Sequence, residues 1–102
     1  MDRLETLKQF LETRPEDCFV RYGVAQEYVK RGELEQAIEQ FEKIRELDAD
    51  YQATYFHLGK TYEKAGRPED ARKSYEQGIE VSMRTGDAHA RSELQGALDE
   101  LG

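Results

Sequence analysis

Few side chains in this sequence could act as nucleophiles, bases or metal ligands. The chain has one cysteine, Cys18, and two histidines, His57 and His89. A cysteine becomes reactive when a nearby base or cation stabilises its thiolate, and a zinc ion needs several ligands at short spacing. Cys18 has no histidine near it in the sequence, and the two histidines are not three or four residues apart as ligands on one helix would be. The sequence therefore indicates neither thiol catalysis nor a metal site.

Adjacent carboxylates, such as Glu16 with Asp17 and Asp99 with Glu100, could suggest acid–base catalysis. That chemistry needs two carboxyl groups facing one substrate. These pairs lie at expected helix ends or outer faces, where acidic side chains stabilise a first helical turn or stay in solvent. No glycine-rich loop follows a strand, so no phosphate site is indicated. We predict a protein that is not an enzyme and has no metal and no cofactor.

The length and charge of the chain limit its class and its partners. A chain of 102 residues suits one small domain, and its formal net charge is −7, from 15 basic and 22 acidic residues. This balance disfavours nucleic acid and anionic membranes as partners, because both attract clustered lysine and arginine. The first 20 residues contain five carboxylates and no apolar run, unlike a secretory signal, and no segment approaches the roughly 20 apolar residues of a membrane span. We expect a cytoplasmic protein.

The elements that must position any site are predicted to be helices. Apolar residues recur every three or four positions in six segments, as in Leu34, Ile38, Phe41 and Ile44, and none shows the alternation of a strand. The predicted fold is therefore all-α, with six helices and short connections that make neighbouring helices antiparallel. The residues expected at helix ends are Pro15, Gly32 and Gly66 as terminators, Pro68 in a first turn, and Asp50 and Asp87 as N-caps of the fourth and sixth helices.

The stretch YVKRGELEQAIEQFE, residues 28–42, returns as YEKAGRPEDARKSYE, residues 62–76, which is an offset of 34 residues. Small residues, Ala25 and Gly59, are expected where the two helices of a hairpin cross. Large aromatic residues such as Phe41 and Tyr75 are expected to fill the space beside them. Met83 stands where the pattern has a terminating proline, so we expect the fifth helix to run toward Thr85. Gly78 stands where the first copy has Ile44, and we expect lighter packing there.

This pattern of small and aromatic residues resembles the tetratricopeptide repeat family. In the second copy the resemblance rests on Tyr55, Leu58, Gly59, Tyr62, Ala71 and Tyr75, and in the first on Val24, Ala25, Tyr28, Ala37 and Phe41. It covers nearly the whole chain and implies a right-handed superhelical array of helix hairpins. The implied division is a leading helix of a partial repeat (1–17), repeats over 18–51 and 52–85, and a C-terminal capping helix (86–102).

The resemblance also implies a function, because in this family the first helix of each hairpin lines a concave surface that binds peptides. The residues implied for this groove are Phe19, Tyr22, Gln26, Val29 and Lys30 in the first copy, and Ala53, Phe56, Lys60, Glu63 and Lys64 in the second. We expect Asp87, Ala90 and Leu94 to continue its wall. The three lysines favour a protein or peptide partner with acidic residues beside an apolar anchor. The lysine and asparagine clamp with which some members hold chaperone tails is not present.

The two end helices indicate an alternative function. Both have one apolar face, as expected of helices that cover the ends of a repeat array. If Phe10 or Leu101 is left exposed, the domain could instead be a structural module that self-associates as a weak homodimer.

Overall fold

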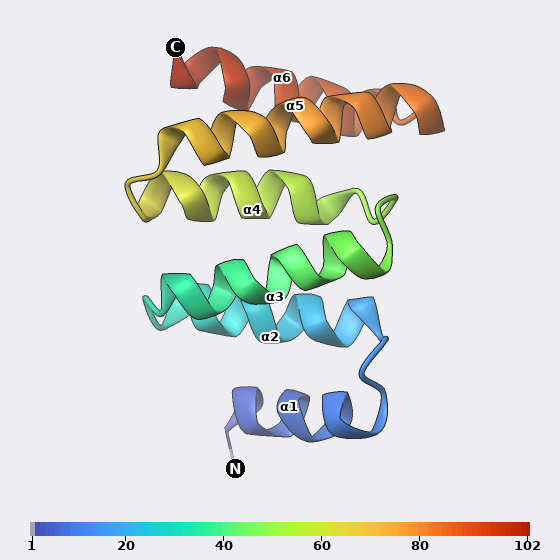
Figure 1. Cartoon of the computed structure of the whole chain (residues 1–102), viewed down its shortest axis with the longest axis vertical. Helices are drawn as coiled ribbons and strands as arrows, with labels where there is room; N and C mark the ends of the chain where they lie inside the picture. Colours follow the sequence, from blue (N-terminus) through green and yellow to red (C-terminus); the bar gives the residue numbers. More distant parts are fainter. Residues whose placement is uncertain (1) are drawn as a thin grey trace.

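The structure, a computed structural model, describes residues 2–102 and has six α-helices. They stack in chain order along the longest dimension, with consecutive helices antiparallel and the two termini at opposite ends (Figure 1). The predicted all-α, right-handed superhelical array of helix hairpins is confirmed. The helices are α1 (Arg3–Thr13), α2 (Cys18–Lys30), α3 (Leu34–Leu47), α4 (Ala53–Lys64), α5 (Pro68–Thr85) and α6 (Ala88–Leu101).

The turns inside the two hairpins use glycine as predicted. Gly32 after α2 and Gly66 after α4 both have φ of +75°, a left-handed conformation that residues with a Cβ adopt only at a cost. Pro68 follows as the first residue of α5, where a missing N–H does no harm. Because α5 has no early proline stop, it runs to Thr85 as expected.

The prediction of helix caps was right at one aspartate and wrong at the other. The Asp87 carboxylate accepts a hydrogen bond from the Ala90 N–H at 3.0 Å and caps α6. Asp50 does not cap α4, which begins three residues later, after Gln52, without a side-chain cap bond. The Asp50 N–H instead donates to the Asp48 carboxylate at 3.0 Å, so this aspartate belongs to the preceding turn.

The core is built from small residues that face large ones. Ala25, Ala37 and Ala71 are fully buried, as are the rings of Phe41 and Tyr75. At the crossing of α4 and α5, an added Cβ on Gly59 would lie 2.6 Å from Cζ of Tyr75. The helices approach this closely only because position 59 has no side chain.

Two buried tyrosines end at carboxylates on neighbouring helices. The Tyr75 hydroxyl donates a hydrogen bond to Glu63, and the Tyr62 hydroxyl donates to Glu42. Burial first, and then these carboxylates, raise the pKa of Tyr75 and the pKa of Tyr62 above the usual value of 10.0. Both effects disfavour a charged phenolate in the folded state.

These pKa shifts predict unfolding in alkali. Since the pKa values are raised in the folded protein, the unfolded chain loses its tyrosine protons first, and the stabilisation is complete below pH 10 and is lost as the pH rises further. Circular dichroism during an alkaline titration should show helix loss in step with tyrosine ionisation. Phenylalanine cannot ionise, so Tyr75→Phe should lose less unfolding free energy between neutral and alkaline pH than the wild type loses. Helicity that outlasts tyrosine ionisation would contradict this account.

Candidate peptide-binding groove

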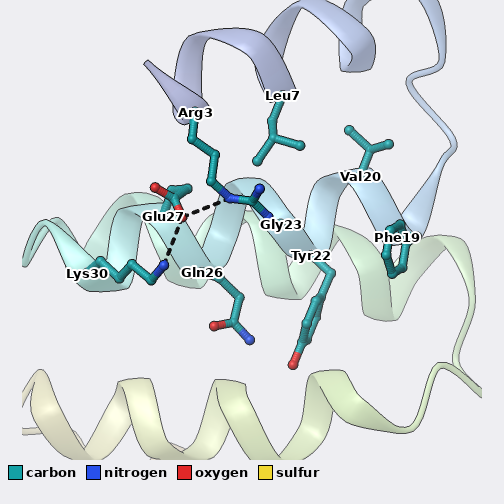
Figure 2. Close-up of a pocket in the computed structure, with 9 residues that line it drawn as sticks. All are labelled: Arg3, Leu7, Phe19, Val20, Tyr22, Gly23, Gln26, Glu27 and Lys30. Atoms are coloured by element: carbon teal, nitrogen blue, oxygen red, sulfur yellow. Dashed lines mark hydrogen bonds and ion pairs between the residues drawn. The ribbon is translucent and has the colours of Figure 1, made fainter.

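A cavity of about 260 Å³ lies between α1 and α2. Leu7 points from α1 toward α2, and Val20 and Gly23 of α2 face it (Figure 2). An added Cβ on Gly23 would be only 3.2 Å from Cδ1 of Leu7, so the missing side chain lets the two helices approach. Phe19 lies at the edge of this cavity, with 76% of its surface exposed. The walls of the cavity are thus mainly apolar.

A row of half-buried aromatic rings leads from this cavity to the next hairpin. In Figure 2, Tyr22 and Gln26 point from α2 toward α4. The Tyr22 ring is 5.4 Å from the ring of His57 on α4, and His57 is 5.5 Å from Phe56. Both pairs meet edge to face, a favourable geometry for aromatic rings. Burial lowers the pKa of His57, so the imidazole at the centre of this row is neutral near pH 7.

The row ends at a second hollow, between α4 and α6. Phe56 and Lys60 line it from α4, and the Lys60 ammonium lies 5.6 Å from the centre of the Phe56 ring. The α6 side is formed by Ser92, Glu93, Gly96, Ala97 and Glu100. We call the cavity, the aromatic row and this second hollow together the candidate groove.

The charges of the candidate groove differ from the basic strip that the sequence suggests. Glu27 accepts from Arg3 at 3.2 Å and from Lys30 at 3.3 Å, while Lys60 lies 3.9 Å from Glu63. Within residues 2–102, no carboxylate pairs with Lys64. The cationic groups that reach furthest into solvent are therefore Arg3, Lys30 and Lys64, whereas Glu93 and Glu100 make the α6 end acidic.

The structure separates the predicted groove residues that line a hollow from those that do not. Phe19, Tyr22, Gln26 and Lys30 line the first cavity, and Phe56 and Lys60 line the second hollow. Val29 packs against the core, Ala53 and Lys64 are exposed, and the carboxylate of Glu63 accepts the Tyr75 hydroxyl. Glu63 therefore has a structural partner as well as a place near the groove.

The predicted continuation of the wall by Asp87, Ala90 and Leu94 is wrong. Leu94 is only 1% exposed, because it fills the space above Gly78, where an added Cβ would lie 2.8 Å from Cδ1 of Leu94. Asp87 caps the helix and Ala90 is half-buried. The lighter packing expected at Gly78 is thus compensated by Leu94, and α6 turns a different face to the groove.

Several groove-lining residues were not predicted from the sequence. Arg3, Leu7, Gly23 and Glu27 line the cavity, and Glu93, Gly96 and Glu100 line the hollow. His57 had a usable signal, because it stands next to Phe56 in the sequence and in a position that the family uses for its clamp. The sequence contains no comparable signal for the α6 residues, because their orientation depends on how Leu94 packs on Gly78.

The residues that could do chemistry are not brought together. The His57 ring packs on aromatic rings, and His89 is 3.9 Å from Glu93 on the exposed surface. Burial raises the pKa of the Cys18 thiol, which disfavours the reactive thiolate. Over residues 2–102, no three His, Cys, Asp or Glu side chains gather as a metal ion would require. None of the helices in that range is both long and apolar enough to cross a membrane.

Known proteins that cover most of this chain are similar to it in sequence and in structure. A family model described as RMD1-3, Regulator of microtubule dynamics protein 1-3, matches residues 20–102. A TPR repeat-containing protein of Pseudomonas aeruginosa is 31% identical over 98 residues, which are 96% of this chain and 93% of that protein. The solution structure of a tetratricopeptide repeat domain protein from Salinibacter ruber is 46% identical, with a TM-score of 0.81, over 85% of this chain and 88% of that one.

A more distant neighbour shares the fold alone. The structure of PcrH in complex with the chaperone binding region of PopD superposes with a TM-score of 0.88 at 12% identity. The match covers 96% of this chain and 74% of that one.

Proposed function

Because the chain belongs to the tetratricopeptide repeat family and, over residues 20–102, to the family described as regulator of microtubule dynamics protein 1-3, we propose that it binds a peptide segment of a partner protein in the candidate groove. The fold is a protein-interaction fold that is generally non-enzymatic. A fold does not select a ligand, so the proposal must rest on the surface itself.

One observation carries the proposal, namely the partly exposed aromatic row formed by Tyr22, His57 and Phe56. Aromatic side chains are frequent among the residues that dominate binding energy, because they bury a large area at little entropic cost. Here the row joins two hollows, so an extended segment could place one apolar side chain in each. PcrH, which has this fold, is in complex with a binding region of PopD, and this supports a peptide as the kind of ligand.

The exposed cations favour a segment with acidic residues. Lys60 and Lys64 lie on α4, about one and two helical turns after Phe56, and Lys64 has no carboxylate partner among residues 2–102. We propose that a carboxylate of the bound segment lies near these two lysines, next to an apolar side chain held on Phe56. Because the lysines are at the edge, their charges should affect affinity and association rate more than folding.

Reversing both charges in Lys60→Glu/Lys64→Glu tests this proposal. The protein would first select ligands from a random peptide library, and the dissociation constant of a selected acidic peptide would be measured by fluorescence anisotropy. The double variant should weaken binding by about tenfold or more at low salt, and by less at high salt, because salt screens the charges. The melting temperature should change little.

The matched control is Lys43→Glu/Lys73→Glu, which makes the same change of charge at exposed positions on α3 and α5. It should leave peptide affinity nearly unchanged. Equal affinity of the wild type and of Lys60→Glu/Lys64→Glu for every selected peptide would exclude the proposed position of the ligand.

A further inference from the structure

The N-terminal helix α1 exposes a face whose equivalents in the other hairpins are buried. With the 34-residue offset, Arg3, Leu7 and Phe10 of α1 correspond to Ala37, Phe41 and Ile44 of α3. All three α3 residues are fully buried, whereas Phe10 is 54% exposed, Leu7 is half-buried and Arg3 is exposed. Leu4, on the side of α1 toward α2, is buried normally. The face of α1 that carries Arg3, Leu7 and Phe10 is therefore more exposed than the equivalent face of α3.

The other hairpins show which kind of element covers this face. Phe41 of α3 has the ring of Tyr22 from α2 at 6.0 Å, and Gly78 of α5 lies against Tyr55 of α4. In both cases the first helix of the same hairpin supplies part of the cover, and the next hairpin or α6 supplies the rest, through His57 on Phe41 and Leu94 on Gly78. No described residue takes this place beside α1, which packs on α2.

The cavity beside α1 has the size and position of a large side chain from such a helix. Position 57 on α4 meets the ring of Tyr22 at 5.4 Å. The equivalent position on α2 is Gly23, and the cavity of about 260 Å³ opens there, between Leu7 and Phe19. A helix that lay on α1 as α2 lies on α3 would bring one bulky side chain into this space.

The charged side chains at the edge of this cavity indicate which charges a bound helix would carry. The side chains of Arg3 and Lys30 are 66% and 70% exposed, whereas the Glu27 carboxylate between them is 12% exposed. A helix arriving at this rim therefore meets mainly positive charge, which favours carboxylates on its edge. A second copy of this chain, with a net charge of −7, would meet general repulsion.

We propose that α1 and α2 form a helix seat, made of Arg3, Leu7, Phe10, Phe19 and Gly23, for an amphipathic helix of a partner protein with an acidic edge. The helix takes the place that the first helix of a hairpin takes in the two repeats, and inserts a large apolar side chain beside Gly23. This inference rests on the proposed function and extends it, because the seat shares with the candidate groove the cavity between α1 and α2.

A stapled peptide can test the seat directly. The probe copies residues 18–30, the helix that fills the equivalent place on α3, with Cys18 replaced by serine and a lactam staple to keep it helical. Two versions carry either two glutamates or two lysines at the positions of Gln26 and Lys30. The intact protein should bind the glutamate version about fivefold or more tightly than the lysine version at low salt. Arg3→Gln/Lys30→Gln should remove this preference.

Two variants should weaken binding of the probe while leaving the α4 lysines unchanged. Phe10→Ser removes an exposed apolar contact, and Gly23→Leu fills the cavity; each should weaken binding by about tenfold or more. Met83→Ser, which changes a side chain 59% exposed on α5, is the matched control and should have no effect. Lys60→Glu/Lys64→Glu should bind the probe within about twofold of the wild type, which separates the seat from the ligand position on α4.

Amide chemical shifts of the wild type provide a measurement that does not depend on folding of the variants. The probe should shift residues 3–10 and 19–27 and leave residues 56–64 largely unchanged. Failure of the stapled probe to bind, or shifts confined to residues 56–64, would overturn the seat while leaving the groove proposal standing. A dimer of the protein alone that Phe10→Ser dissociates would also overturn it, in favour of a second copy as the occupant.

Discussion

Gly59→Ala is expected to destabilise the protein by about 3 kcal/mol or more, although it adds a single methyl group. The new Cβ would lie 2.6 Å from Cζ and 2.7 Å from Cδ1 of Tyr75. Tyr75 cannot easily give way, since its ring is fully buried and its hydroxyl is held by Glu63. The helices α4 and α5 must then separate, which loosens the core on both sides of the crossing. Urea unfolding followed by circular dichroism measures the loss, and Gly59→Leu should cost at least as much.

Gly96→Ala is the matched control for this prediction. Gly96 also lies inside a helix, but an added Cβ there has no neighbour within 4 Å. Alanine is the better helix former by roughly 0.5–1 kcal/mol, so this variant should be slightly more stable than the wild type. If Gly59→Ala behaved like Gly96→Ala, the close crossing of α4 and α5 would be incorrect.

Leu94→Ala should cost about 2–5 kcal/mol of unfolding free energy, the usual range for a fully buried leucine. Leu94 is 1% exposed and fills the space left by Gly78, so its removal leaves a cavity that the neighbouring backbone cannot close. It also weakens the attachment of α6, which covers the last hairpin. Thermal unfolding monitored by circular dichroism would show the change as a lower melting temperature.

Leu98→Ala provides the comparison on the same helix. Leu98 is half-buried, so this variant removes as many atoms but less buried area, and it should cost clearly less than Leu94→Ala. Equal losses for the two leucines would mean that α6 does not pack through Leu94.

Most of the fold could be predicted from the sequence, because the features that specify it are local and occur twice. The spacing of Ala37 and Phe41, repeated in Ala71 and Tyr75, follows from helix packing alone. The end of α2 at Gly32 requires a conformation that glycine readily adopts. The cap of α4 was missed because Asp48 and Asp50 both suit a turn, and only the three-dimensional path decides between a turn and a cap.

The candidate groove was predictable where it follows the repeat and unpredictable where it depends on packing. Tyr22 and Phe56 are equivalent positions, so recognising one located the other. Glu63 differs from its equivalent, Val29, although both positions were predicted to line the groove. The structure adds that Tyr75 replaces Phe41 twelve residues further on, and that the two polar groups are hydrogen-bonded to each other.

The contribution of α6 could not be obtained from the sequence. Its apolar residues indicate which side of the helix is buried, but not how that side is rotated relative to α4. The rotation depends on Leu94 entering the space above Gly78, a contact between residues on different helices. As a result, Glu93 and Glu100 face the candidate groove, and the charge of that end differs from the expected one.

The stacking of the helices has a further consequence for how the protein folds. Each helix packs mainly on its neighbours in the chain, with a smaller contact between α4 and α6 and a ring contact between Tyr22 on α2 and His57 on α4. Contacts between residues close in sequence form quickly, because little loop entropy is lost, and an array of this kind can fold from the middle outward. The continuous buried core runs from α2 to α6, and Leu4, the buried residue of α1, lies outside it. We therefore expect helix α1 to unfold first and refold last, and its amides to exchange hydrogen faster than those of α2 to α6.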